Sequence, residues 1–390
     1  MRVAIFTDND FDKVNGVTTT LRAVLRHAPP DLQPRVYTLS DLDVCERDYL
    51  ALASIGAGLP YYPEMRIYLP RLAALSRAAR ADGVGVIHLT TPGPMGLAAR
   101  WVARRAGARL SGSFHTHLAE YAATLSGSAM LGAAMNVYMR WLYGACTPVL
   151  VPSAATRSML ARAGWPEGNL ALWSRGVDTV LFDPARRSAA LREHWRVSDR
   201  RPAVLYAGRL SREKGLASVR KMAAALRQWR ASHRIVFVGD GPYRRELAEA
   251  CPEAVFTGTL RPDDVATAMA SADLFLFPST TDWLGNVVLE AQASGLPVVV
   301  ADEGGPQENM LAGTTGFVCR GGDPVSFAGR VSELIFDEGL RGRMAGQART
   351  YALTRQWHHA LRPLYQAWRQ PAPEPAPIAR AVGLPQEHRS

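Results

Sequence analysis

Two carboxylates and a glycine at close spacing are the most informative feature of this sequence. Residues 279–300 read STTDWLGNVVLEAQASGLPVVV, with Asp282 and Glu290 on either side of Gly285. The pattern predicts a helix that starts just after the glycine, so the N–H groups of 286–288 would lie unpaired in its first turn and could bind an anion. Each carboxylate could accept hydroxyl groups, which suits a sugar nucleotide. A capped helix with Asp282 in a surface loop explains these residues equally well.

A second loop of this kind, AGRLSREKGL at 207–216, contains two cations. Arg209 ends a predicted strand, and Lys214 follows at the start of the next helix. Two cations beside a helix N-terminus can neutralise a diphosphate. Solvated surface charges are the alternative. Lysine is rare in this arginine-rich chain, where Lys13 and Lys221 are its only other occurrences, and this rarity favours a functional role.

Two further segments carry weaker signals. Gly16, in NGVTTT (15–20), follows a predicted strand, but the segment lacks the G-x-G-x-x-G of dinucleotide-binding proteins. His115 and His117 follow another strand within SFHTHLAEY (113–121). Either imidazole could act as a general base, because its pKa lies near neutrality, or could simply hydrogen-bond within a loop. No further ligands are arranged around them for a metal.

The segments that carry these residues lie between predicted strands and helices that alternate along the chain. In the N-terminal half, strands are expected at 3–7, 35–40, 85–90, 108–116 and 148–153. In the C-terminal half, strands are expected at 202–209, 234–241, 254–258, 273–279 and 296–302. Strands that alternate with long helices indicate parallel, doubly wound sheets, which bind ligands at the carboxyl ends of their strands.

We therefore expect an α/β protein of two Rossmann-like domains that face a cleft. The first would span residues 1–180 and the second 181–355, with the boundary inside 176–200. Residues 356–370 read as an amphipathic helix that packs back on the N-terminal domain. The Pro-rich segment 371–390 has no apolar period and is expected to be a disordered tail.

The composition of the 390-residue chain fits a large globular protein and argues against a nucleic-acid-binding, disulfide-stabilised or zinc-binding protein. Hydrophobic residues make up 47% of it, enough for two cores. A formal net charge of +10 suits anionic partners, but the basic patches with interleaved aromatic residues that bind nucleic acid are missing. The four cysteines are far apart, so neither a disulfide framework nor a zinc site follows.

The motifs of both halves, taken in order, resemble those of one family. They are NGV (15–17), SFHTH (113–117), RGVD (175–178), AGRLSREKG (207–215), FVGDGP (237–242), GNVVLEAQASGLPVV (285–299) and GGPQE (304–308). Over nearly all of residues 1–367 the chain is similar to the retaining glycosyltransferases of family 4, which have the GT-B architecture. Within that family it most resembles the GDP-mannose-dependent α-mannosyltransferases that act on lipid or polyprenyl-like acceptors at the inner membrane surface.

This resemblance implies a nucleotide-sugar donor in the cleft between an N-terminal acceptor domain and a C-terminal donor domain. Glu290 would then hold the ribose of the donor, and Asp282 would hold the transferred sugar. The backbone at Gly285, Asn286 and Val287 would approach the diphosphate and the sugar.

The same resemblance assigns roles to residues outside that stretch. Arg209 and Lys214 would neutralise the leaving diphosphate, and Gly16 would let the N-terminal loop close over the phosphates. His115 would lie near the reacting sugar, and Arg175 would contribute to donor binding. No metal ion or other cofactor is implied.

The sequence departs from the family pattern in two places. The first acid of the Glu-x7-Glu motif is Asp282, one methylene shorter, and Trp283-Leu284 replace a small polar residue and Phe. The sugar would then lie closer, be held through water, or be a different sugar. His117 replaces the usual acid after His-Thr, which leaves the identity of the acceptor open.

The reaction implied is transfer of a hexose, mannose from GDP-mannose, to a lipid-linked or glycan acceptor in α configuration. No second carboxylate is placed as a nucleophile beside a general acid, as a glycosidase requires. The resemblance implies transfer with retention through an oxocarbenium-like state. Open alternatives are a UDP-sugar donor, an epimerase or phosphorylase of the same architecture, and a non-catalytic nucleotide-sugar-binding protein.

Two stretches of the N-terminal half are candidates for contact with an acidic bilayer. Residues 64–81 have four arginines among apolar residues, and residues 128–145 are strongly apolar with Met, Trp and Tyr. Either could lie on a membrane to reach a lipid acceptor, and packing of both on their own sheet explains them equally well. The sequence shows neither a signal peptide nor an apolar run long enough to span a bilayer. We expect a cytoplasmic protein, peripheral at the inner membrane face if the bilayer contact exists.

Overall fold

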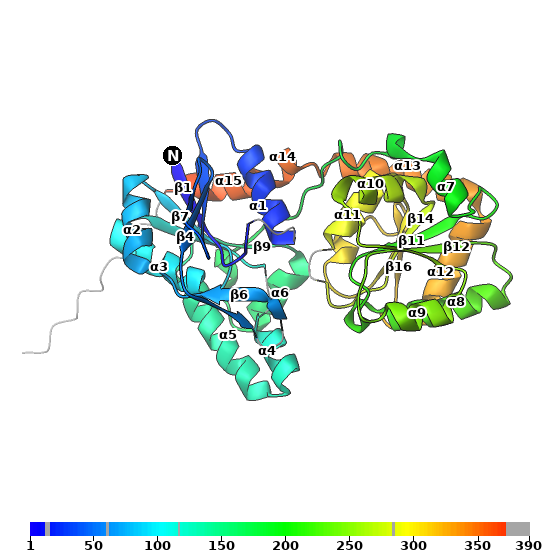
Figure 1. Ribbon diagram of the computed structural model, residues 1–390, viewed down its shortest axis with the longest axis horizontal. Coiled ribbons are helices and arrows are strands. Elements are labelled where there is room, and N and C mark those ends of the chain that lie inside the picture. The colour runs from blue at the N-terminus through cyan, green and yellow to red at the C-terminus, as the bar shows by residue number, and fades with distance from the viewer. Residues whose placement is uncertain (12–15, 60–61, 116–117, 283–284, 372–390) are drawn as a thin grey trace, which may run out of the picture.

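The structure, a computed structural model, describes residues 1–11, 16–59, 62–115, 118–282 and 285–371. His117, Trp283 and Leu284 lie outside the described residues. Figure 1 shows two α/β bodies side by side, the N-terminal one in blue to green and the C-terminal one in green to orange. Each body contains a largely parallel sheet packed against helices, as the alternation of strands and helices predicts.

The N-terminal sheet has eight strands in the order β10-β9-β8-β7-β1-β2-β4-β3. Its strands are β1 (Arg2–Phe6), β2 (Gln33–Ser40), β3 (Val44–Cys45), β4 (Tyr49–Ala53), β7 (Val86–Leu89), β8 (Arg109–Ser113), β9 (Val149–Val151) and β10 (Leu170–Leu172). Its helices are α1 (Gly16–Arg26), α2 (Leu72–Ala81), α3 (Pro94–Ala106), α4 (Leu118–Ser126), α5 (Ala129–Tyr143) and α6 (Ala154–Arg162).

The C-terminal sheet has six strands in the order β13-β12-β11-β14-β15-β16. Its strands are β11 (Ala203–Ala207), β12 (Arg234–Val238), β13 (Val255–Gly258), β14 (Leu274–Phe277), β15 (Val298–Ala301) and β16 (Gly316–Cys319). Its helices are α7 (Ala189–His194), α8 (Leu216–Gln228), α9 (Arg244–Ala250), α10 (Pro262–Ser271), α11 (Asn286–Ala293), α12 (Pro324–Phe336) and α13 (Glu338–Leu353).

The central strands are continuous apolar runs because both faces of each sheet are covered. Every residue of β14 and β15 is buried, as expected for a parallel strand between two helical layers. In β1 the side chains alternate between two cores. Ala4 and Phe6 lie in one cluster, and Val3 and Ile5 lie in another, on the opposite face of the sheet.

The sequence prediction missed four strands of the two large sheets, β3, β4, β10 and β16, and one hairpin. Strands β3 and β10 have only two and three residues, too few to reveal a period. Residues 64–68, interpreted as part of a basic amphipathic stretch, belong to β6 (Tyr62–Tyr68), which pairs antiparallel with β5 (Gly56–Leu59) in a separate two-stranded sheet.

The end of the described chain returns to the N-terminal domain. Two helices, α14 (Trp357–Ala360) and α15 (Arg362–Arg369), cross from one body to the other in Figure 1. Trp357, Leu364 and Trp368 are buried in the cluster that contains Val3 and Ile5. The prediction of a single helix over 356–370 is wrong in one respect, because the segment forms two helices. Pro363 lies in the first turn of the second helix, where proline is tolerated.

Candidate functional site

Charged side chains of the C-terminal domain gather where its central strands end. Arg209 follows β11, and Lys214 closes a short 3-10 turn before α8. Asp282 follows β14, and Glu290 lies in α11. Strands β11 and β14 pair in parallel, so the loops that follow them leave the same edge of the sheet. Residues far apart in the sequence meet there.

Lys214 and Asp282 form an ion pair that the sequence did not reveal. The Lys214 Nζ donates to Asp282 Oδ1 at 2.7 Å and to Oδ2 at 2.9 Å. Each side chain is 24% exposed, so the pair borders solvent instead of the core. An ammonium has three donors and each carboxylate oxygen two lone pairs, so both groups keep capacity for a ligand.

The start of α11 has the geometry of an anion site, with one correction. Gly285 has φ of 57°, in the left-handed region, and a Cβ built there would come within 2.9 Å of Pro306, so glycine is required. The N–H of Val288 donates to the Gly285 carbonyl oxygen at 2.9 Å. Among the described residues, the N–H groups of Asn286 and Val287 have no partner, so two of the three predicted amides remain free.

The side chains of Glu290 and Arg209 have no hydrogen bond or ion pair within the described ranges of the chain. Glu290 is half-buried, and burial raises the pKa of its carboxyl group to about 7. Arg209 is exposed, with its charge available to a ligand. Both side chains can therefore bind a ligand without breaking an existing contact.

The two domains approach each other at Gly16 and Asn286. Helix α1 begins at Gly16, and a Cβ built on this residue would lie 3.8 Å from Asn286 Nδ2. The Oδ1 of Asn286 is buried and has no partner among the described residues. A buried amide oxygen without a donor is costly, so a hydroxyl or N–H group of a ligand would stabilise it.

His115 lies in a buried chain of polar groups. Its Nε2 is 2.6 Å from Ser113 Oγ, and its Nδ1 is 2.6 Å from Arg175 Nη2. Burial, with the neighbouring Arg175 charge, holds the pKa of the imidazole well below its ordinary value. Since both ring nitrogens are engaged, His115 has no free nitrogen in this structure with which to take a proton.

Two buried residues behind His115 were missed by the sequence analysis. His88 of β7 has Nε2 at 3.0 Å from Ser113 Oγ, and Trp368 of α15 donates from Nε1 to His88 Nδ1 at 3.2 Å. Ser113 and His115 are two residues apart on one face of an extended segment, which is the only sequence signal for this arrangement.

Glu308, from the GGPQE segment, joins the two domains. Its carboxylate accepts from the N–H groups of Ala154 at 2.7 Å and Ala155 at 2.8 Å, the first two residues of α6. A carboxylate at a helix N-terminus is stabilised by the helix dipole. The sequence analysis identified this segment only as part of a motif.

The described residues form neither a metal centre nor a membrane-spanning helix. Within the described ranges, no three His, Cys, Asp or Glu side chains are grouped as metal ligands would be. In the same part of the chain, each helix is too short or too polar to cross a bilayer.

Two family models match the chain. One, described as Glycosyltransferase Family 4, matches residues 14–181, and the other, described as Glycosyl transferases group 1, matches residues 201–337. Sulfoquinovosyl transferase SQD2 of Arabidopsis thaliana is 31% identical over 375 residues, 92% of this chain and 71% of its own. A GDP-mannose-dependent alpha-mannosyltransferase of Mycobacterium tuberculosis is 31% identical over 375 residues, 92% of this chain and 93% of its own.

Solved structures share the arrangement of both domains. Sucrose-phosphate synthase from Thermosynechococcus elongatus superimposes with a TM-score of 0.76 at 18% identity, over 94% of this chain and 98% of its own. Anabaena HepE in complex with UDP-glucose superimposes with a TM-score of 0.70 at 19% identity, over 94% of this chain and 98% of its own.

Two facing Rossmann-like domains define a glycosyltransferase of the GT-B architecture, which confirms the expected fold class. The chain belongs to glycosyltransferase family 4 and is a transferase enzyme. The relatives named above differ in the sugar that their names specify, so the family alone does not determine the donor.

Proposed function

We propose that this enzyme transfers mannose from GDP-mannose to a lipid-linked or glycan acceptor with retention of the α configuration. The observation that carries the proposal is the group of charges at the carboxyl ends of β11 and β14. There an ion-paired lysine and an exposed arginine follow β11, and the carboxylates of Asp282 and Glu290 follow β14. The donor is chosen because relatives from Mycobacterium tuberculosis and Mycolicibacterium smegmatis are named GDP-mannose-dependent alpha-mannosyltransferases.

The proposed roles follow from the chemistry of each group. Arg209 and Lys214 neutralise the diphosphate of the donor, together with the free N–H groups at the start of α11. Glu290 accepts the ribose hydroxyl groups. Asp282 holds the Lys214 ammonium in place with one or both oxygens and accepts a sugar hydroxyl with its remaining lone pairs.

The N-terminal domain supplies the other wall of the proposed site. Gly16 leaves space for the phosphates beside Asn286, whose buried Oδ1 would receive a donor from the ligand. His115 acts in this proposal by positioning Arg175 beside the sugar, since both of its ring nitrogens are already engaged.

Chemistry in this site consists of positioning and charge stabilisation. The bond between the anomeric carbon and the phosphate oxygen breaks, and its electron pair leaves with the diphosphate. The acceptor oxygen then bonds to the anomeric carbon from the same face, and its proton passes to the departing phosphate. Fixed cations stabilise the charge that develops on the diphosphate, which is commonly the largest contribution to catalysis. No metal ion is required in this scheme.

A UDP-sugar donor is the second candidate function. It is supported by the fold shared with a protein solved in complex with UDP-glucose and by a relative named for a sugar other than mannose, sulfoquinovosyl transferase SQD2. The diphosphate site, the reaction and its stereochemistry would be the same, and only the base and sugar subsites would differ.

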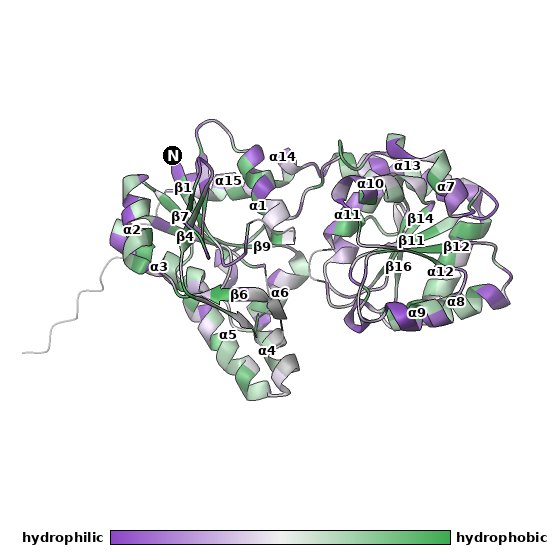
Figure 2. Cartoon of the chain, in the orientation of Figure 1, coloured by the Kyte–Doolittle hydropathy of each residue, from purple (hydrophilic) through white to green (hydrophobic). Residues whose placement is uncertain are grey.

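Contact with an acidic bilayer is proposed for α5. Figure 2 shows that this helix is largely hydrophobic where it projects with α4 from the N-terminal domain. Met130, Leu131, Val137 and Trp141 are exposed large apolar side chains on it. In α2, by contrast, Leu75 is buried against the domain's own core, so the packing interpretation is favoured for that helix. Binding to vesicles with and without anionic lipid, compared for the protein and for Trp141→Ser, tests the contact.

Titration calorimetry with GDP-mannose, UDP-glucose, GDP and UDP tests the donor assignment. The proposal predicts binding of the guanine pair and weaker or undetectable binding of the uracil pair. Binding of the uracil pair alone would establish the second candidate. Turnover of the bound donor without an acceptor, or with phosphate alone, would instead indicate an epimerase or a phosphorylase, and tight binding without any turnover would indicate a non-catalytic protein.

A further inference from the structure

Arg175 is a buried cation without a counter-ion among the described residues. It is 2% exposed and lies just after β10. Its Nη2 contacts His115, and its guanidinium lies 4.9 Å from the centre of the Trp173 ring. The Nε and Nη1 atoms are buried with no hydrogen-bond partner. Desolvation without a compensating carboxylate lowers the pKa of Arg175 to about 9.

The groups that hold Arg175 do not neutralise its charge. A guanidinium only donates, so His115 Nδ1 accepts, and the Nε2–H of this neutral ring donates to Ser113 Oγ. An indole N–H also only donates, so the Nδ1 of His88 accepts from Trp368 and its Nε2–H donates to the same serine. The polar chain from Trp368 to Arg175 therefore fixes the position of the guanidinium and leaves its charge uncompensated.

A small cavity of about 40 Å³ lies beside Arg175 where the two domains meet. Its lining includes Ser153, Ser174, Glu308 and Arg355, and the Nε of Arg355 is also buried without a partner. Among the described residues no ion pair joins Glu308 to Arg175, and the two oxygens of Glu308 accept from N–H groups of α6. The cavity is thus bordered by two arginines and one carboxylate, and it has room for about three water molecules, or for one small oxyanion group.

We propose that Arg175 binds a sulfonate, carboxylate or phosphate group of a substrate, distinct from the diphosphate of the donor. The transferred sugar or the acceptor would carry this group. The inference rests on the proposed function, because it adds a charged substituent to the substrates of the same cleft.

The position of the cavity favours the sugar or the acceptor over the diphosphate. Gly305 lines the cavity, and its N–H donates to the Asp282 carbonyl oxygen at 3.0 Å. The cavity therefore adjoins the loop of the acid that is proposed to hold the sugar. Arg209 and Lys214, proposed for the diphosphate, belong to the opposite domain from Arg175.

Sulfate is a probe for this site that does not depend on knowing the substrate. Arg175→Met keeps the length of the side chain but removes its charge, and its thermal midpoint without ligand should equal or exceed that of the parent, because an uncompensated buried charge is lost. Sodium sulfate should raise the midpoint of the parent by more than that of Arg175→Met. Sodium chloride at matched ionic strength controls for general salt effects.

The test compares the sulfate-induced shift of the thermal midpoint in the parent with that in Arg175→Met. Sulfate bound at the diphosphate site would shift both proteins equally, so only the difference reports on Arg175. Equal shifts in the parent and Arg175→Met would overturn the proposal. Should the Met variant fold poorly, Arg175→Lys keeps the charge, and we expect it to retain part of the sulfate shift. A Lys variant whose shift is fully absent while its fold is intact would also contradict an anion site.

Paired substrates distinguish the two sources of the anionic group. For the sugar, UDP-glucose is compared with UDP-glucuronic acid, and GDP-mannose with GDP-mannuronic acid, by calorimetry. For the acceptor, diacylglycerol is compared with phosphatidic acid, using the donor that binds. We expect the acidic member of one comparison to be preferred, and Arg175→Met to lose about tenfold to a hundredfold for that member alone, as for a hydrogen bond to a charged group.

Failure of this inference can be told apart from failure of the proposed function. If GDP and UDP both fail to bind the parent, the proposed function fails, whereas the sulfate comparison still reports on Arg175. If a nucleotide binds but acidic and neutral members of both comparisons behave alike, only the inference fails. If Arg175→Met weakens binding of the free diphosphate as much as Lys214→Ala does, Arg175 serves the diphosphate and the inference is wrong.

Discussion

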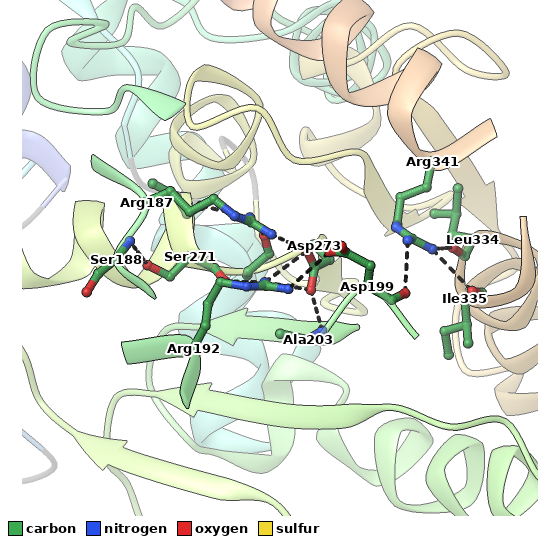
Figure 3. A network of polar contacts seen from close by, with 12 residues as sticks. Arg187, Ser188, Arg192, Asp199, Ala203, Ser271, Asp273, Leu334, Ile335 and Arg341 are labelled. Atoms are coloured by element: carbon green, nitrogen blue, oxygen red, sulfur yellow. Dashed lines mark hydrogen bonds and ion pairs between the residues drawn. The ribbon is translucent and has the colours of Figure 1, made fainter. Parts of the chain in front are cut away.

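The two halves of the molecule differ in whether a buried charge has an ion-pair partner. In the C-terminal domain the carboxylate of Asp273, 8% exposed, accepts from Arg187 at 2.8 Å, from Arg192 at 2.9 Å and from the N–H of Ala203 at 2.8 Å (Figure 3). In the N-terminal half Arg175 is equally buried, but no carboxylate of the described residues pairs with it.

The comparison separates charges that stabilise the fold from charges kept for a ligand. Asp273 precedes β14, at the amino end of the strand, away from the loops that carry the candidate site. At that end Asp273 forms ion pairs with Arg187 and Arg192, which hold residues 187–192 against the sheet. The Lys214–Asp282 pair is intermediate, because its charges are paired but partly exposed at the carboxyl end of the same sheet.

The largest effect on stability is expected from breaking the ion pairs of Asp273 with Arg187 and Arg192. Asp273→Ala removes the nearer carboxylate from the buried guanidinium of Arg192 and leaves only Asp199, at 3.7 Å. Breaking a buried ion pair typically costs about 3–5 kcal/mol. Thermal unfolding followed by circular dichroism should show a midpoint several degrees lower. Asp263→Ala, which removes an exposed partner of Arg186, is the matched control and should change the midpoint little. Equal midpoints for Asp273→Ala and this control would contradict the structural role.

Lys214→Ala should be the most damaging change to catalysis with little effect on folding. Losing a fixed charge that stabilises the transition state costs about 2.7–4 kcal/mol of barrier, a fall in turnover of at least about a hundredfold. Lys221→Ala, on the exposed face of α8, is the control in the same steady-state assay. Activity of Lys214→Ala within a few-fold of the parent would remove this lysine from the mechanism.

Asp282→Asn tests whether the ion pair acts as one unit. Its kcat/KM should fall about tenfold to a hundredfold, because the carboxylate that holds the Lys214 ammonium becomes neutral. In the double variant with Lys214→Ala the two losses should not add, since the two side chains are in direct contact. Additive losses would indicate that Asp282 acts on the sugar independently of Lys214.

The smallest effect expected is a pH dependence of donor binding that originates at Glu290. Its pKa of about 7 in the free protein means that the carboxyl group is mostly protonated at pH 6. Ribose hydroxyl groups bind best to the charged form, so affinity should rise by about tenfold between pH 6 and pH 8 and then level off. Calorimetry across this range should show a flat profile for Glu290→Gln. The same slope in that variant would assign the titration to another group.

The raised pKa of Glu290 also predicts a pH dependence of folding stability, and its sign is opposite to that of donor binding. A carboxyl group whose pKa is raised on folding favours the folded state at low pH, and this contribution is lost as pH rises through about 7. Glu290→Gln should therefore raise the thermal midpoint relative to the parent at pH 8 more than at pH 5.

The two sheets were predictable because their central strands are buried on both faces. Runs such as 298–301 are apolar without interruption, and the loops after such strands are where α/β proteins bind ligands. Very short strands such as β3 and β10 contain too few residues for a pattern.

The site was predictable in its members but not in its contacts. Lys214 and Asp282 could be placed on neighbouring loops, whereas their ion pair depends on side-chain conformations that no spacing encodes. The chain behind Arg175 joins His88 to Trp368, 280 residues apart. A single histidine within an apolar strand gives no signal of a partner from a helix at the far end of the sequence.

Binding of free GDP and UDP to three proteins is the most direct test of the central claim, that charges of the C-terminal domain hold the diphosphate. Titration calorimetry would compare the parent, Lys214→Ala and Arg175→Met. We expect that one nucleotide, GDP in our proposal, binds the parent and Arg175→Met alike and binds Lys214→Ala at least about tenfold more weakly. Equal binding to the parent and Lys214→Ala, or no binding of either nucleotide to the parent, would contradict it.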